Sequence, residues 1–320
     1  MSSSEMLRTV LPLLFCCAVG CAGSSDDAAY ATDEGALTLT KIAVEDSAAL
    51  PLEEVSGLGV RTINGKPQYL AVSDSSTTLV TFALGPNGLP KDVAEHKLKR
   101  IFGGGESQWE AVAGDASGRV FIMSEAEGTI SVLSKGLELD HVITLSIPED
   151  HPLYAAWERD ENSRGEGMLL LENGHILVAK EKGPAALVEF APKGEDAAGY
   201  TPELALKNRA FEVPAGEESV FEAVAFWELK TSAARLIGDI SDLAVDANGT
   251  IILLSDQSRA IARIERELSV DERKIDLKAL WELPRKVDKP EGLVIVGGKP
   301  FVASDLPRAD ALSFFALSAL

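Results

Sequence analysis

No cysteine follows Cys21 in this chain of 320 residues, and the two others, Cys16 and Cys17, lie shortly before it. The rest of the sequence therefore has neither a disulfide nor thiol chemistry. An exported domain without disulfides must be stabilised by packing alone.

Basic residues are also scarce. The sequence has 30 lysines and arginines against 50 aspartates and glutamates, which gives a formal net charge of −20. Such a chain repels phosphate backbones and anionic lipid headgroups, so we expect no nucleic-acid partner, whereas it can attract cations. We expect a monomer.

Common catalytic motifs are missing as well. The four histidines, His96, His141, His151 and His175, do not have the spacing of metal ligands, and the sequence contains no Gly-x-Ser-x-Gly motif. The glycine run 103–105 indicates a connection between strands rather than a phosphate-binding loop. These absences leave the question of enzymatic activity open.

The N-terminus has the pattern of an export signal. The apolar run Val10–Val19 is too short to span a membrane and has the length of a signal-peptide core. It leads into Ala18-Val19-Gly20-Cys21 and a polar stretch, which resembles a bacterial lipoprotein signal. In that family the cysteine carries the lipid and becomes the mature N-terminus. An ordinary cleaved signal peptide is the alternative.

The resemblance predicts the organisation of the whole chain. We expect a lipoprotein signal peptide over residues 1–20, a flexible tether over 21–35 and one folded domain over 36–320. Lipid on Cys21 would anchor the protein to a membrane of the cell envelope, either the outer membrane or the cell surface, on the extracytoplasmic side.

Five segments of the sequence share one plan. Each begins with a short apolar strand, continues through a turn dipeptide such as Asn173-Gly174, and returns in a second strand that ends in an acid. Asn-Gly and related dipeptides favour tight hairpins because they tolerate positive φ. The first strands begin at Ser56–Leu58, Glu110–Val112, Glu166–Met168, Ser241–Leu243 and Glu291–Leu293.

These repeats predict an all-β fold, a five-bladed β-propeller of four-stranded antiparallel blades. We expect Leu37–Val44 to close the ring by pairing with a strand near Leu312–Phe315. Gly216–Ile237 is expected to be an insertion, and a degenerate sixth blade there is the alternative. The expected fourth strands are His96–Phe102, His141–Ile147, Ala205–Val213 and Lys274–Leu283.

The repeats also predict a cluster of acids. In an antiparallel hairpin the start of the first strand and the end of the second lie at the same end, so the acids of all blades gather at one mouth of the channel. Oxygen ligands suit calcium, although each acid could instead cap a turn. The candidate metal ligands are Glu110, Glu125, Glu166, Glu181, Asp239, Asp256, Glu291 and Asp305.

Three of the repeats resemble the SdiA-regulated family. The similarity lies in Gly165–Met168 with Val178–Glu181, in Ile240–Leu243 with Leu253–Arg259, and in Lys289–Leu293 with Ala303–Asp305. The resemblance implies a five-bladed propeller with bound calcium and no established activity. Phytase-like esterases, calcium-dependent lactonases and NHL-type propellers are more distantly similar.

Two functions follow as hypotheses. The first is a calcium-binding, non-catalytic module that binds a small molecule or a protein at the acidic channel mouth, or serves as a scaffold. The second is a metal-dependent hydrolase of an ester, lactone or phosphoester. The fold alone does not decide between them, because propellers host many functions.

Overall fold

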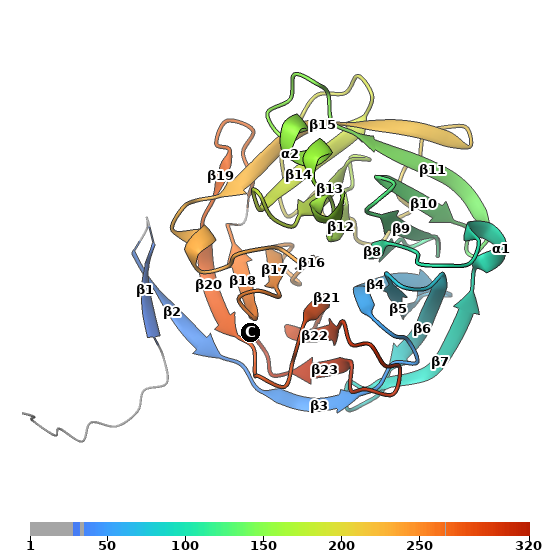
Figure 1. Cartoon of the computed structure of the whole chain (residues 1–320), viewed down its shortest axis with the longest axis horizontal. Helices are drawn as coiled ribbons and strands as arrows, with labels where there is room; N and C mark the ends of the chain where they lie inside the picture. The colour runs from blue at the N-terminus through green and yellow to red at the C-terminus, as the bar shows by residue number, and fades with distance from the viewer. Residues whose placement is uncertain (1–27, 33–34, 266) are drawn as a thin grey trace, which may run out of the picture.

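The computed structural model describes residues 28–32, 35–265 and 267–320. The predicted all-β fold is confirmed, and Figure 1 shows its sheets set radially around a central axis as in a β-propeller. The predicted signal peptide and the lipidation site Cys21 lie outside the described residues. Among the described residues, no helix is long and apolar enough to cross a membrane.

Two of the sheets have four strands each. The first is built from consecutive hairpins. The second contains the last three strands of the chain and one strand from the N-terminal part. The first sheet consists of β4 (Val55–Ile63), β5 (Lys66–Ser73), β6 (Thr78–Leu84) and β7 (Pro90–Lys97). The second consists of β21 (Pro290–Val296), β22 (Lys299–Ser304), β23 (Phe314–Leu317) and β3 (Val44–Ala48).

The largest sheet has nine strands, because two groups of four join through the parallel pairing of β11 with β15, and β19 adds to the far end of β15. One group is β8 (Trp109–Gly114), β9 (Val120–Ser124), β10 (Thr129–Leu133) and β11 (Leu139–Ser146). The other is β12 (Gly167–Leu170), β13 (Ile176–Lys180), β14 (Ala186–Pro192) and β15 (Glu218–Leu229), with β19 (Lys274–Ile275) beside it.

The remaining sheet has six strands, and the β1–β2 hairpin extends it at its outer edge. Its strands are β16 (Asp242–Val245), β17 (Ile251–Ser255), β18 (Ala260–Ile264), β20 (Leu277–Glu282), β2 (Gly35–Lys41) and β1 (Ala28–Thr32). The helical segments are short: α1 (Lys99–Phe102), α2 (Tyr154–Arg159), η1 (Glu161–Ser163) and η2 (Ala233–Arg235).

The hydrophobic core lies between neighbouring groups of strands. β5 shows why: Tyr69 and Ala71 pack toward β22 and β23, whereas Leu70 and Val72 pack toward β8 and β9. Successive side chains of a strand point to opposite faces, so a strand inside the ring needs apolar residues on both. β9, β13 and β17 are accordingly buried along their whole length.

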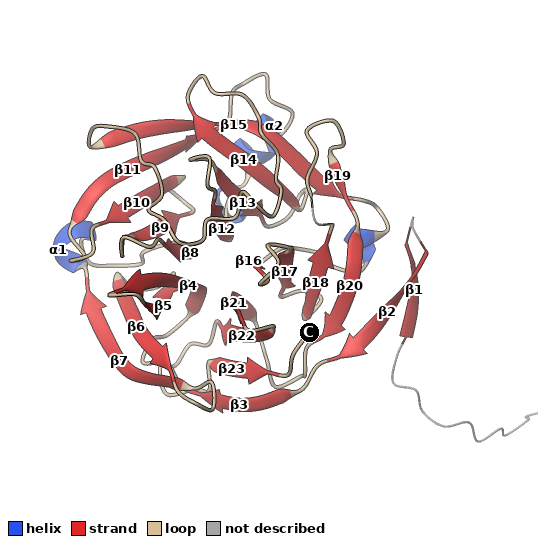
Figure 2. Ribbon diagram, turned by 180° about the vertical axis from the view of Figure 1, so that it is seen from behind, coloured by secondary structure: helices blue, strands red, loops and turns tan. Residues whose placement is uncertain are grey.

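The innermost strands approach each other so closely that their starts need glycine. A Cβ on Gly57 would lie 2.8 Å from the carbonyl oxygen of Glu110, and one on Gly167 would lie 2.7 Å from Oδ1 of Asp242. This close approach of the strands explains why the second residue of most repeats is small, as in Ser56-Gly57 and Glu166-Gly167. Figure 2 shows β4, β8, β12, β16 and β21 around the axis from behind.

Three expectations about outer strands were wrong. The fourth strand of the first repeat is β7, whereas most of the expected segment His96–Phe102 forms the short helix α1. The strand that closes the ring is β3, in which Ala48 faces Phe314 and Val44 faces Leu317, whereas most of the expected segment forms β2 and pairs with β20. The fourth strand of the third repeat is β15, within the segment expected as an insertion. Buried and more exposed side chains alternate along β15, as they do in a half-buried strand. The long excursion 193–217 before it lengthens the third repeat, so this strand does not lie where the spacing of the other repeats predicts a fourth strand.

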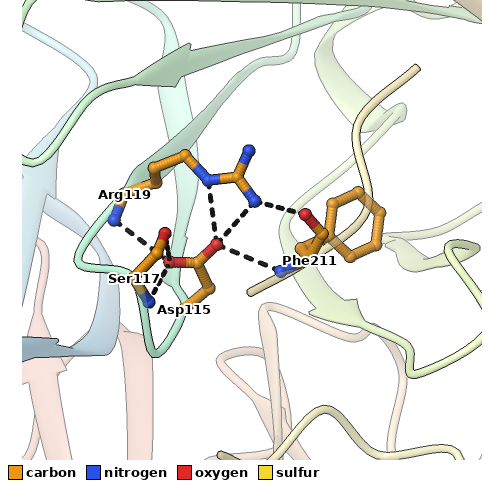
Figure 3. A network of polar contacts seen from close by, with 4 residues as sticks. All are labelled: Asp115, Ser117, Arg119 and Phe211. Carbon is orange, nitrogen blue, oxygen red and sulfur yellow. Dashed lines mark hydrogen bonds and ion pairs between the residues drawn. The ribbon is translucent and has the colours of Figure 1, made fainter. Parts of the chain in front are cut away.

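A buried carboxylate fastens this excursion to the ring (Figure 3). Asp115, 3% exposed, accepts hydrogen bonds from the backbone and side chain of Ser117 and Arg119 and from the backbone N–H of Phe211, at 2.6 to 3.1 Å. Burial by itself would raise the pKa of Asp115, but the hydrogen bonds from Ser117 and Arg119 outweigh it and hold the pKa below its usual range.

Asp115→Ala is therefore expected to lower the free energy of unfolding by about 3 kcal/mol, because it leaves Arg119 and several N–H groups without their acceptor. Urea denaturation measures the change. The Arg308–Asp310 pair is the control, since both of its side chains are 72% exposed. Asp310→Ala should leave stability unchanged, and equal losses in the two variants would contradict this role for Asp115.

Candidate functional site

The acids of the site stand where the innermost strands begin. The pairing register shifts at Glu110 in β8 and at Glu291 in β21, so each glutamate is the extra residue of a β-bulge. The bulges follow Gln108 and Lys289, whose φ angles of 52° and 44° are unusual for residues other than glycine. Bulges redirect side chains and are common beside functional sites. Here they occur at the strand ends that carry these glutamates.

Two serines occupy the same repeat position as the glutamates and fix the neighbouring strands. The hydroxyl of Ser56 donates to the carbonyl of Trp109, and that of Ser241 donates to the carbonyl of Pro290 at 2.8 Å. Each carbonyl belongs to the residue directly before a glutamate. The serines therefore hold the backbone that carries Glu110 and Glu291.

These strand starts surround a cavity of about 320 Å³, which we call the acidic cavity. Seven of its lining residues carry carboxylates and one, Lys182, is basic. The lining consists of Ser56, Asp74, Gln108, Glu110, Glu125, Asn162, Glu166, Glu181, Lys182, Glu291 and Asp305.

Six of the eight candidate ligands line this cavity, namely Glu110, Glu125, Glu166, Glu181, Glu291 and Asp305. Asp239 and Asp256 do not. Asp239 is buried and accepts hydrogen bonds from the Ser255 hydroxyl and the Gln257 N–H, so it caps a turn. Asp74 lines the cavity although it was not among the candidates. Its position at the end of a second strand, equivalent to Glu125, was the available signal.

A loop covers part of the acidic cavity and adds an amide to it. Lys180, fully buried, donates to the carbonyl and hydroxyl of Ser163 at 3.1 and 3.2 Å. The backbone N–H of Arg164 donates to Glu125 at 2.8 Å. These contacts hold the loop after α2, and thereby place Asn162 at the cavity. In Figure 1 α2 lies on the face turned to the viewer.

Burial and mutual repulsion make the cavity acids hard to ionise. Burial raises the pKa of Glu110 to about 9, and the carboxylates of Glu125 and Asp74 add to the rise. For the same first reason the pKa is about 7 for Glu125 and about 6 for Asp74. Glu166 and Glu291 have pKa values well above the usual range, because of burial and then of nearby acids.

Basic residues compensate only the rim of the cavity. Lys182 lies 2.5 Å from Glu181, and Lys289 lies 2.6 Å from Asp305. Within the described part of the chain, no lysine or arginine forms an ion pair with Glu110, Glu166 or Glu291. These three inner glutamates keep their carboxylates buried only as neutral acids or beside a cation.

The side chains of the acidic cavity offer the kind of donor atom that calcium binds. All the side chains that line the cavity except Lys182 offer oxygen, and Oδ1 of Asp74 and of Asp305 are buried without a hydrogen-bond partner. Calcium prefers six to eight oxygen ligands in flexible geometry. Among the described residues, however, no three acidic or histidine side chains are spaced as a preformed metal site. The chemistry of the cavity fits calcium, and the side chains would have to draw together around an ion.

The radial sheets and this axial cavity define a β-propeller with an acidic mouth. The model of the SdiA-regulated family matches residues 153–298. The match confirms, over these residues, the resemblance to the SdiA-regulated family seen in the repeats.

Two solved structures are similar to this chain at low identity. Glutaminyl cyclase from Myxococcus xanthus is similar with a TM-score of 0.50 and 14% identity, over 88% of this chain and 97% of that one. The calcium-binding protein regucalcin from Agrobacterium tumefaciens has a TM-score of 0.47 and 13% identity, over 88% and 95% of the two chains. The first of these supports the fold alone. No curated protein matches the sequence.

Proposed function

We propose that the chain is a five-bladed propeller that binds calcium in the acidic cavity and acts as a non-catalytic binding module on the cell envelope. The observation that carries the calcium proposal is the set of inner glutamates, Glu110, Glu166 and Glu291. They are buried, close enough to repel and, among the residues that the structure describes, not paired with a lysine or arginine. A divalent cation would replace the protons that these acids otherwise hold.

The blade number is supported by the core. The hydrophobic residues form five clusters, each shared by two neighbouring groups of four strands, and the five innermost strands follow one another around the axis. On this interpretation the nine-stranded sheet is two blades joined by the β11–β15 pairing. The segment that could have held a sixth blade supplies only β15, which completes the third.

A binding role is favoured over hydrolysis because none of the histidines lines the acidic cavity. His141, for example, bonds the Gly216 carbonyl and the Ser219 hydroxyl, and His175 bonds Glu189 and Glu195. The site has carboxylates and two amides, which can hold a cation and a cationic or hydroxyl-rich ligand, and its lining lacks the histidine that most often serves as a general base.

Calorimetry tests the calcium proposal. A ligand that binds only the folded state stabilises it by mass action, by about 2.7 kcal/mol when free calcium is about 100 times its Kd. The melting temperature of the mature chain should therefore be higher in calcium than in chelator, by roughly 5 °C. Identical melting temperatures in the two buffers would refute calcium binding.

Membrane attachment is proposed through lipid on Cys21. If the lipid is present, the protein should partition into detergent and incorporate labelled palmitate, and Cys21→Ser should abolish both, because no other cysteine remains in the mature chain. Cys16→Ser is the control, since that residue is removed with the signal peptide. A water-soluble mature protein that begins at another residue would contradict the anchor.

A further inference from the structure

The end of the axis opposite the acidic cavity is also hollow. A cavity of about 420 Å³ lies there, between the later residues of the five innermost strands, such as 112–114 of β8 and 293–296 of β21. Glu110 and Glu291 stand at the beginnings of the same two strands and line the acidic cavity. The two cavities therefore share an axis and lie at its opposite ends. We call the second one the apolar cavity.

The lining of the apolar cavity carries no charge. Its residues are aliphatic side chains and glycines, with Tyr69 and Pro67 from β5, in a chain of which 25% of residues are charged. At its rim Val60 and Val296 are 42% and 37% exposed, which is unusual for large apolar side chains that serve only the core. The volume lies within the range of small-molecule pockets, roughly 300 to 1,000 Å³.

A buried carboxyl group lies next to the lining of the apolar cavity. Asp242 is 3% exposed, accepts hydrogen bonds from the N–H groups of Leu243 and Leu293 at 2.7 and 2.6 Å, and lines neither cavity. Leu243 and Leu293 themselves line the apolar cavity. An anion entering there would meet no lysine or arginine in the lining. The lining thus favours an uncharged ligand.

One wall of the apolar cavity comes from the excursion 193–217 rather than from a blade. Ala205 and Leu206 line the cavity, and the N–H of Leu206 donates to the Leu170 carbonyl of β12 at 3.1 Å. Buried Glu189 accepts the N–H groups of Ala198 and Gly199 at 3.0 and 2.9 Å, and Asp115 holds the other end of the excursion.

Ordering a segment of this length costs conformational entropy, which the buried carboxylates offset. The excursion is therefore a fixed wall at the mouth of the apolar cavity. Long ordered loops of this kind are usually functional.

We propose that the apolar cavity is a second binding site, which takes an uncharged small molecule with an alkyl chain. The chain would lie along the innermost strands against Leu206, and the polar end of the molecule would face solvent between Val60 and Val296. The proposal does not depend on the cation at the other end of the axis, so its test is done in chelator.

The probe is 1-octanol, with octanoate as its charged counterpart, and the readout is saturation-transfer NMR on the mature chain. Octanol is expected to bind saturably, and octanoate at least about tenfold more weakly, because Val60 and Val296 would displace part of the water around its carboxylate at the rim, where the lining offers no lysine or arginine to pair with it. Val60→Glu should abolish octanol binding. Val93→Glu is the matched control, because Val93 is 40% exposed on β7 and does not line the cavity.

Three results would overturn the proposal: no saturable octanol binding, equal binding of octanol and octanoate, or equal loss of binding in the two valine variants. Unchanged octanol binding in Val60→Glu would do the same. Circular dichroism establishes that each variant is folded, and Val296→Glu, on the neighbouring innermost strand β21, replaces Val60→Glu if the latter fails to fold. It is expected to show the same loss.

Discussion

Glu166→Gln is expected to remove most of the stabilisation that calcium gives. Glu166 is only 9% exposed, and its pKa is raised first by burial and then by the acids on both sides of it, Glu110 and Glu291 among them. Both other inner glutamates therefore lie near enough to Glu166 to repel its charge. Glutamine keeps its shape and removes its charge.

The size of the effect follows from mass action. If calcium at about 100 times its Kd stabilises the wild type by about 2.7 kcal/mol, a 100-fold loss of affinity reduces this to below about 1 kcal/mol. In chelator the variant should melt at or above the wild-type temperature, because glutamine resembles the protonated acid.

Calorimetry in calcium and in chelator measures both quantities. Asp196→Asn changes an exposed acid in the excursion and should respond to calcium as the wild type does. A full calcium response in Glu166→Gln would exclude Glu166 as a ligand. Equal loss in Asp196→Asn would mean that calcium acts through overall charge.

The second large effect concerns pH. Six acids of the cavity have higher pKa values in the folded chain than in the unfolded one, namely Asp74, Glu110, Glu125, Glu166, Glu181 and Glu291. The folded state therefore binds more protons between the two values, and stability falls as pH rises through that window. For Glu110 the window extends from its ordinary value of 4.5 to about 9, and for Glu125 it extends to about 7. In chelator the melting temperature should therefore fall between about pH 5 and pH 8.

Calcium should flatten this dependence, because the ion compensates the carboxylates that lose their protons. Glu110→Gln should flatten it in chelator as well, since it removes an acid whose window extends to about pH 9. Glu138→Gln, which changes an exposed glutamate, should leave the slope as it is. A melting temperature that rises with pH in chelator would contradict the buried acidic cavity.

The sequence was informative where local rules set the geometry. Strand starts and second-strand ends must meet at one end of a hairpin, and six of the eight candidate acids do line one cavity. The same rule also brings Asp74 of the first repeat to this mouth, and Asp74 does line the cavity although it was not among the candidate ligands. The bulges could not be foreseen, because Gln108 and Lys289 adopt positive φ without being glycine. The surrounding sheet must impose this conformation.

Long-range contacts account for the remaining differences. Nothing near Asp242 in the sequence shows that its carboxylate accepts the N–H of Leu293, 51 residues away. Nor does local pattern show that residues 193–217 form the excursion while Glu218–Leu229 forms an outer strand. That outcome depends on Asp115 and Glu189, which hold the excursion from two different parts of the chain.

The most direct measurement is a crystal structure of the mature chain grown with calcium, with an anomalous difference map at the acidic cavity. If calcium binds in the acidic cavity, we expect one strong peak on the axis, about 2.3 to 2.6 Å from carboxylate oxygens of at least two of Glu110, Glu166 and Glu291. An acidic cavity without a peak at saturating calcium, with these glutamates hydrogen-bonded to one another, would contradict it.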